Sequence, residues 1–218
     1  KLLGVNSHLN LLSSNSEITK NQIDTIKDNL DHDLYNIVLE SIETKGLLIK
    51  DNISQGILIR GYEDIKSDHY VYNKLISGNL FDDSFNEIII GDYLSNSIGA
   101  NLGDKIKLAI PKSDKSILGN IPRFKTLKII GIFDFGMYEY DANLVFISAE
   151  LSRKLLLMKE NSYNKVEFFL KDPTEVDFLK KKLTAIIDSK NLNLFPYSWK
   201  DRNLALINAL NVEKNVMF

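Results

Sequence analysis

Alternating polar and apolar residues, together with short runs of β-branched and aromatic residues, predict a chain rich in β-strands. A period of two places every second side chain on one face of a strand, and residues such as Val, Ile, Phe and Tyr favour the pleated conformation. From these signals we expect strands at residues 4–12, 35–43, 46–50, 56–62, 87–90, 105–110, 124–133, 143–147, 165–170 and 192–195.

Between these strands, apolar residues three or four positions apart follow capping residues and predict five helices. The first helix follows a capping box of Thr19 and Gln22, the second runs from Asp92 to the left-handed cap Gly99, and the third runs from Ser148 to Met158. The fourth begins at Asp172-Pro173 and is expected to bury Val176, Leu179, Leu183 and Ile186. The last helix begins at Ser198.

The order of the elements predicts an α+β fold in which one part of the chain interrupts another. Strands and helices alternate near both ends, whereas the middle is mostly strands. We therefore expect residues 1–80 and 150–218 to form one α+β subdomain, with residues 81–149 inserted into it as a β-rich subdomain.

The connection between strands 105–110 and 124–133 is the most informative segment of the sequence. A hairpin loop normally needs about two to five residues, whereas this connection is much longer and has a proline at each end. A loop of this length is costly to order and is often functional. Its residues are Pro111, Lys112, Ser113, Asp114, Lys115, Ser116, Ile117, Leu118, Gly119, Asn120, Ile121 and Pro122.

Two features of this hairpin suggest a binding role, and each has a simpler alternative. Ile117 and Leu118 form an apolar tip that either enters a groove of a partner or folds back onto the domain. Lys105, Lys107 and Lys125 lie at the base, where they either attract an acidic partner or form an ordinary solvated strand face.

Composition narrows the range of partners. Lys and Arg number 27 against 29 Asp and Glu, a net charge of -2, so no basic field indicates nucleic acid. The absence of cysteine excludes disulfides and Cys-ligated zinc, without fixing the compartment. The chain begins at Lys1, contains no apolar run of about 18 residues, and becomes more apolar towards Phe218. We expect it to be a piece of a longer protein, in which a membrane span could begin near Phe218.

Candidate catalytic and metal sites are weak. No histidine stands in a metal-ligand spacing, and Asp31-His32-Asp33 is better explained as a solvated turn than as a cation site. Asp134-Phe135-Gly136 matches the kinase magnesium motif, but the other kinase motifs and the Walker motif are absent. We expect Glu139 and Asp141 to protect the solvent face of a strand edge. The sequence therefore predicts no enzyme activity, cofactor or metal.

Several segments resemble known permeases. The match extends over nearly the whole chain and is strongest from about residue 88 onward. The periplasmic domains of MacB-like ABC permeases resemble this chain at Ile88–Gly91 and Gly99–Ile106. The lipoprotein-releasing permeases of the LolC/LolE family resemble it at Asn120–Lys125, Ile130–Phe133, Ser198–Arg202 and Val212–Met217. The proline-bounded hairpin is similar to the LolC branch of that family.

This resemblance implies a MacB-like periplasmic domain with a discontinuous α+β "porter" subdomain and an inserted β-rich "sabre" subdomain, which bears a long hairpin called the hook. In the family, the domain lies between the first two membrane spans of a bacterial inner-membrane permease and faces the periplasm. The permease works with a separate cytoplasmic ATPase, LolD, and a second permease subunit, which is LolE-like or a second copy. Together they extract acylated lipoproteins and pass them to the soluble carrier LolA.

Carried over by position, the resemblance implies that residues 111–122 form the hook that recruits the carrier. It also implies a second contact, the pad, made of Lys107, Phe124 and Lys125. The sequence departs from the family here, because Ile117 and Leu118 replace proline and methionine, Lys107 and Lys125 replace arginines, and Phe124 replaces a glutamine. Lysine lacks the bidentate geometry of arginine.

Two other functions stay open. A MacB-type domain would transmit motion to partner proteins without recruiting a carrier, and the long hairpin argues against it. An FtsX-like domain would activate a cell-wall hydrolase, and the run Glu213-Lys214-Asn215-Val216-Met217 argues against that.

Overall fold

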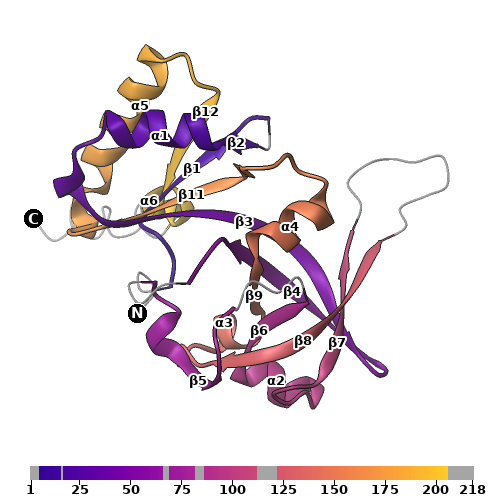
Figure 1. The fold of residues 1–218 in the computed structure, drawn as a ribbon. Helices are drawn as coiled ribbons and strands as arrows, with labels where there is room; N and C mark the ends of the chain where they lie inside the picture. The colour runs from indigo at the N-terminus through magenta and orange to yellow at the C-terminus, as the bar shows by residue number, and fades with distance from the viewer. Residues whose placement is uncertain (1–4, 16, 66–68, 82–85, 112–121, 206–218) are drawn as a thin grey trace, which may run out of the picture. The chain divides into compact units, whose positions relative to one another are not determined.

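The computed structural model describes residues 5–15, 17–65, 69–81, 86–111 and 122–205. The chain forms two compact units, one made of Lys1–Leu39 with Asn164–Phe218 and the other of Glu40–Tyr163. They are called unit 1 and unit 2 below, and Figure 1 labels most of their elements.

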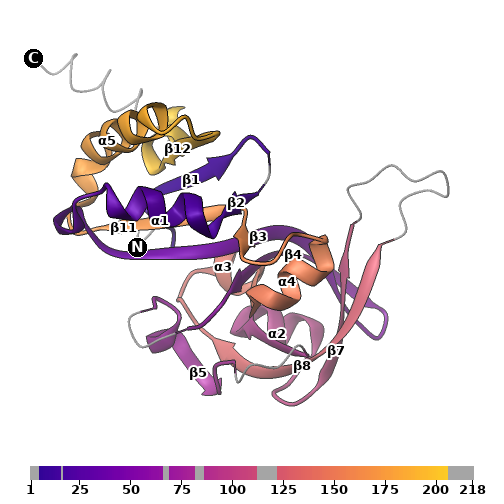
Figure 2. The same ribbon diagram turned by 45° about the horizontal axis from the view of Figure 1, so that its top comes forward.

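Unit 1 is a small antiparallel sheet with helices packed along it. Its central strand β1 (Leu9–Ser13) pairs with β11 (Lys165–Leu170) on one side and with β12 (Leu194–Ser198) on the other. Helices α1 (Lys20–Asp28) and α5 (Val176–Ser189) pack against each other along these strands (Figures 1 and 2). The remaining elements are β2 (Ile18–Thr19), the short 3-10 helices η1 (His32–Leu34) and η3 (Pro173–Glu175), and α6 (Trp199–Arg202).

The predicted caps explain where the helices of unit 1 begin. The hydroxyl of Thr19 accepts a hydrogen bond from the backbone N–H of Gln22, whose side chain accepts one from the Thr19 N–H, which completes the capping box. Asp172 caps η3, and Pro173 follows it as predicted. In α5 the buried residues are Val176, Leu179, Leu183 and Ile187, so the prediction that Ile186 is buried was one residue off.

Unit 2 is built on strands whose pairing closes on itself. The long strand β3 (Tyr35–Lys50) pairs with β4 (Ile53–Tyr62), and β4 pairs with β9 (Leu144–Ser148). Strand β9 pairs in turn with β6 (Glu87–Gly91), and β6 pairs with β8 (Arg123–Phe133). Strand β7 (Lys105–Ile110) then pairs with both β8 and β3, which closes the ring. Strand β5 (Leu75–Gly78) pairs with β8 outside this ring. The unit also contains the two-residue strand β10 (Ser162–Tyr163) and the 3-10 helix η2 (Tyr72–Lys74).

One apolar cluster fills the inner face of this ring. It combines strand residues such as Leu48, Ile106 and Leu108 with Leu94 of α2 (Asp92–Ile98) and Leu155 of α4 (Ala149–Leu156). A closed ring of strands has an inner face that side chains must fill, and alternation along each strand selects them. The residues that alternate with them on β7, Lys105 and Lys107, are exposed on the outer face.

The units do not divide the chain where the sequence predicted. The expected boundaries were 80/81 and 149/150, whereas the compact units meet at 39/40 and 163/164. The reason is that β4 pairs with β9, and β3 pairs with β7, so residues 40–62 belong with the strands that were expected to form a separate insertion. The assignment of porter and sabre subdomains to the two parts stays a prediction.

Two local predictions were also wrong. The strands expected at 35–43 and 46–50 are one continuous strand, β3. Glu139 and Asp141 lie in a short helix, α3 (Tyr138–Asp141), where Asp141 is buried instead of facing solvent. None of the helices in the described part of the chain is long and apolar enough to span a bilayer.

Candidate functional site: the base of the long hairpin

The predicted hairpin is present and its register is defined up to the two prolines. Strands β7 and β8 pair antiparallel from Lys105 opposite Lys128 to Ile110 opposite Arg123. Pro111 is exposed and Pro122 half-buried, directly beyond the last pair. The hook residues between the prolines, Lys112, Ser113, Asp114, Lys115, Ser116, Ile117, Leu118, Gly119, Asn120 and Ile121, lie outside the described residues.

The structure separates the three residues expected to form the pad. Residues directly opposite each other in paired strands project to the same face. Lys125 is opposite the fully buried Leu108, so it lies on the inner face of the sheet and is half-buried. Lys107 and Phe124 lie on the outer face, where the ammonium of Lys107 stands 5.8 Å from the ring centroid of Phe124. Only Lys107 and Phe124 therefore share a surface.

A third strand extends this surface with a residue that the sequence analysis missed. Leu47 of β3 pairs with Ala109 of β7, and Ala109 pairs with Phe124 of β8, so the three residues form one row across the outer face. Leu47 is 46% exposed and Phe124 is 55% exposed. We call Leu47, Lys107, Ala109 and Phe124 the outer row. The sequence did contain a signal for Leu47. Leu47 and Leu48 are adjacent in a strand, so only one of the two side chains can face the hydrophobic core.

Helix α4 supports the inner face of the hairpin base. Arg123, the last paired residue of β8, donates a hydrogen bond from its guanidinium to the carbonyl of Leu155 in α4. Arg153 of the same helix forms two hydrogen bonds with Glu63, at 2.6 and 3.1 Å. The buried Tyr163 donates its hydroxyl hydrogen to the same carboxylate at 2.8 Å.

These partners determine the ionisation of Glu63. Partial burial acts to raise the pKa of Glu63, but hydrogen bonds from Arg153 and Tyr163 outweigh it and leave that pKa below its ordinary value. Burial, and then the hydrogen bond to Glu63, raise the pKa of the Tyr163 phenol. Around neutral pH the Glu63 carboxylate is therefore ionised and the Tyr163 phenol is neutral. In this state Arg153 of α4 stays paired with Glu63, which directly follows β4.

The segment Ser198–Arg202, which carried part of the family resemblance, is anchored to α5 in unit 1. Ser198 and Asp201 form a capping box, in which the Ser198 N–H donates to the Asp201 carboxylate at 2.7 Å. The ammonium of Lys180 contacts both oxygens of Asp201, at 2.8 and 2.7 Å. Burial acts against it, but the hydrogen bonds from Lys180 and Ser198 lower the pKa of Asp201.

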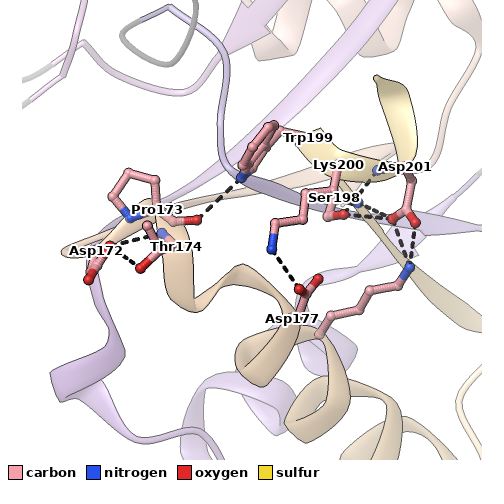
Figure 3. Close-up of polar contacts among 9 residues, drawn as sticks. Asp172, Pro173, Thr174, Asp177, Ser198, Trp199, Lys200 and Asp201 are labelled. Atoms are coloured by element: carbon pink, nitrogen blue, oxygen red, sulfur yellow. Dashed lines mark hydrogen bonds and ion pairs between the residues drawn. The ribbon is translucent and has the colours of Figure 1, made fainter. Parts of the chain in front are cut away.

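Two further contacts hold the same segment. In Figure 3 the side chain of Lys200 points to Asp177 of α5, 2.6 Å away, and the indole N–H of Trp199 points to the carbonyl of Pro173 at 3.3 Å. The start of α6, which leads towards the C-terminal residues 206–218, is thus fixed on unit 1 at three points. The predicted cap at Ser198 is confirmed, whereas residues 206–218, which follow it, lie outside the described residues.

The motifs that resembled catalytic or metal sites have structural roles. Within the described ranges no group of three His, Cys, Asp or Glu side chains could hold a metal ion. Asp31 caps the 3-10 helix η1, and the ring of His32 is hydrogen-bonded to Tyr35 at 2.6 Å. Asp134 accepts a hydrogen bond from the N–H of Gly136 at 2.6 Å, the geometry of a local turn.

Comparison with curated proteins finds LolC permeases. The chain is 24% identical over 181 residues to the lipoprotein-releasing system transmembrane protein LolC of Neisseria meningitidis, which covers 81% of this chain and 43% of that protein. It is 26% identical over 184 residues to LolC of Buchnera aphidicola, covering 78% of this chain and 44% of that protein. The chain thus spans less than half the length of these relatives. No protein-family model matches it.

Solved structures agree on the fold. The periplasmic region of MacB from Actinobacillus actinomycetemcomitans superposes with a TM-score of 0.57 at 13% identity, covering 95% of this chain and 96% of that one. The extracellular domain of the ABC-type transporter YknZ superposes with a TM-score of 0.56 at 12% identity, covering 87% and 99%. The predicted MacB-like α+β fold is confirmed.

Proposed function

We propose that this LolC-like domain is the periplasmic part of an inner-membrane ABC-transporter permease and that it recruits the lipoprotein carrier LolA. Sequence similarity to LolC over most of the chain, and a MacB-like fold, support the permease assignment. Recruitment of the carrier rests on one observation: the paired strands β7 and β8 end at two prolines that bound the hook, beside the exposed side chains of Leu47 and Phe124.

The outer row has the chemistry of a contact surface for such a carrier. An aromatic and an aliphatic side chain, each about half exposed, lie in one cross-strand row and offer apolar area. Lys107 adds a positive charge at the rim, which would orient an acidic partner and increase the association rate. A carrier of acyl chains needs an apolar cavity, and the apolar hook tip at Ile117 and Leu118 would enter its mouth while the outer row contacts the rim.

The wider assembly follows from this assignment. The permease would work with a cytoplasmic ATPase (LolD) and a second permease subunit, either LolE-like or a second copy, and would release acylated lipoproteins from the inner membrane. The contacts of Ser198–Arg202 with α5 fit this arrangement, because they fix the end of unit 1 from which the chain would continue to the next membrane span.

A MacB-type role in transmitting motion without a carrier is the second candidate, and the fold similarity to MacB favours it. The two functions make opposite predictions for binding of LolA. Phe124→Asp and Leu47→Asp place a charge in the outer row, whereas Ile53→Asp changes an equally exposed aliphatic residue at the β3–β4 turn and serves as the matched control.

Calorimetric titration with LolA tests the proposal. We expect each outer-row variant to weaken binding at least about tenfold, equivalent to about 1.4 kcal/mol, while Ile53→Asp binds like the wild type. Equal affinities for all three variants would exclude the outer row as a contact, and a folded wild-type chain that does not bind LolA would favour the MacB-type role.

A further inference from the structure

Two exposed tyrosines stand side by side on unit 2, on elements separate from the hairpin. Tyr93 of α2 is 48% exposed and Tyr138 of α3 is 61% exposed. Their ring centroids are 4.4 Å apart and their planes are inclined by 80°, an edge-to-face pair. Aromatic rings of this exposure contribute little to the core, although Tyr is among the residues enriched at binding interfaces.

The backbone holds this pair in place. Gly91, directly before α2, lies so close to α3 that a Cβ atom there would be 2.2 Å from the carbonyl oxygen of Asp141. The buried carboxylate of Asp141 accepts hydrogen bonds from the N–H groups of Phe135 and Met137, at 2.8 Å each, and so fixes the segment before Tyr138. The backbone that carries the aromatic pair is therefore held in place before any partner arrives, which lowers the entropy cost of binding.

The charged residues next to the pair in the sequence are all negative. Asp92 precedes Tyr93, Glu139 follows Tyr138, and Asp134 lies in the segment that leads to α3; neither helix contains a lysine or arginine. None of these three carboxylates forms an ion pair with another residue in the described part of the chain, and neither does Lys74, whose carbonyl accepts a hydrogen bond from the Asp134 N–H. The aromatic pair is therefore flanked in the sequence by carboxylates that have no ion-pair partner in the described part of the chain.

We propose that the Tyr93–Tyr138 pair is a docking site for an arginine-bearing segment of a partner protein. A guanidinium group stacks on tyrosine faces through cation–π interaction and pairs with carboxylates, and its planar shape suits both contacts better than an ammonium does. This site is independent of carrier recruitment by the hairpin.

The probe for this site is a capped Gly-Arg-Gly-Arg-Gly peptide, added at millimolar concentration to the chain labelled with carbon-13 in tyrosine rings. We expect the ring signals of Tyr93 and Tyr138 to shift, with about tenfold weaker binding for the same peptide carrying citrulline, which keeps the shape but lacks the charge. Tyr93→Ala and Tyr138→Ala should remove the response, whereas Tyr72→Ala, which changes another exposed tyrosine, should leave it unchanged.

A double variant, Asp92→Asn with Glu139→Gln, keeps the aromatic pair and should weaken peptide binding several-fold while flattening its salt dependence. Circular dichroism confirms that each variant is folded. The proposal is overturned if the two tyrosine signals do not shift, if the citrulline peptide binds as well as the arginine peptide, or if the response persists in the alanine variants.

Discussion

Replacing Glu63 by glutamine should loosen α4 from the strands that support the hairpin base. The carboxylate of Glu63 is the shared acceptor of Arg153 and Tyr163, at 2.6 to 3.1 Å. Arg153 is only 11% exposed and Tyr163 is buried. Glutamine keeps the shape but removes the negative charge, which leaves a mostly buried guanidinium without its counter-charge.

The size of the effect follows from exposure. Breaking a buried ion pair costs about 3–5 kcal/mol, and an exposed pair contributes about 0–1 kcal/mol. Because the Glu63 side chain is 43% exposed, solvent screens part of the interaction. We therefore expect Glu63→Gln to lower the free energy of unfolding by about 2 kcal/mol, between these limits.

Denaturation by urea, followed by far-ultraviolet circular dichroism, measures this change. Glu150→Gln is the matched control, because its carboxylate belongs to an exposed pair with Lys154 on the same helix and should change stability by less than about 0.5 kcal/mol. A double-mutant cycle with Tyr163→Phe should give a coupling energy of about 1 kcal/mol. A loss for Glu63→Gln no larger than that of Glu150→Gln would refute the reasoning.

The pH dependence gives a second check on Glu63. Its pKa in the folded state is lowered, so its contribution to stability is fully present above the unfolded-state pKa of about 4.3 and is lost as pH falls through the folded-state pKa. The difference in stability between the wild type and Glu63→Gln should be constant from neutral pH to about pH 5 and then shrink. A difference that grows on acidification would contradict the assigned ionisation.

Three further predictions test other parts of the molecule. Gly91→Ala should destabilise the chain by about 2 kcal/mol or more, because the added Cβ would overlap the Asp141 carbonyl, and urea denaturation measures it. Asp201→Ala removes the N3 partner of the capping box and an ion pair, so the urea midpoint reported by fluorescence of Trp199, the single tryptophan, should fall by an amount equivalent to about 1–2 kcal/mol. Lys107→Glu should lower the association rate with LolA more than Lys125→Glu, which makes the same charge change on the opposite face; equal rates in stopped-flow mixing would exclude steering by the outer row.

Local signals in the sequence were sufficient for the elements that begin or end at a cap. Thr19, Gly99, Ser148 and Ser198 all cap helices as predicted, because a capping side chain or a left-handed residue satisfies backbone groups that are close in the sequence. The two strands of the long hairpin were predicted for the same reason, since alternation along each strand is a local pattern.

These local signals did not predict pairings between residues that are far apart in the sequence. The sequence gives no periodicity that reports the contact of β3 with β7, and that contact closes the ring and moves the boundary of unit 2 to Glu40. The same long-range pairing places Leu47 beside Ala109 and Phe124 in the outer row. Asp141 was misplaced because a buried carboxylate that binds two backbone N–H groups has no signature in alternation.

Titration of the chain with LolA, by calorimetry, tests the central claim most directly when a hook-deleted variant is measured beside the wild type. In that variant a short glycine-containing turn replaces residues 113–120, so the strand pairs from Lys105 to Ile110 and the outer row are kept. We predict that the wild type binds and that the variant loses binding although it folds like the wild type. Undiminished binding by the folded variant would contradict recruitment through the hook.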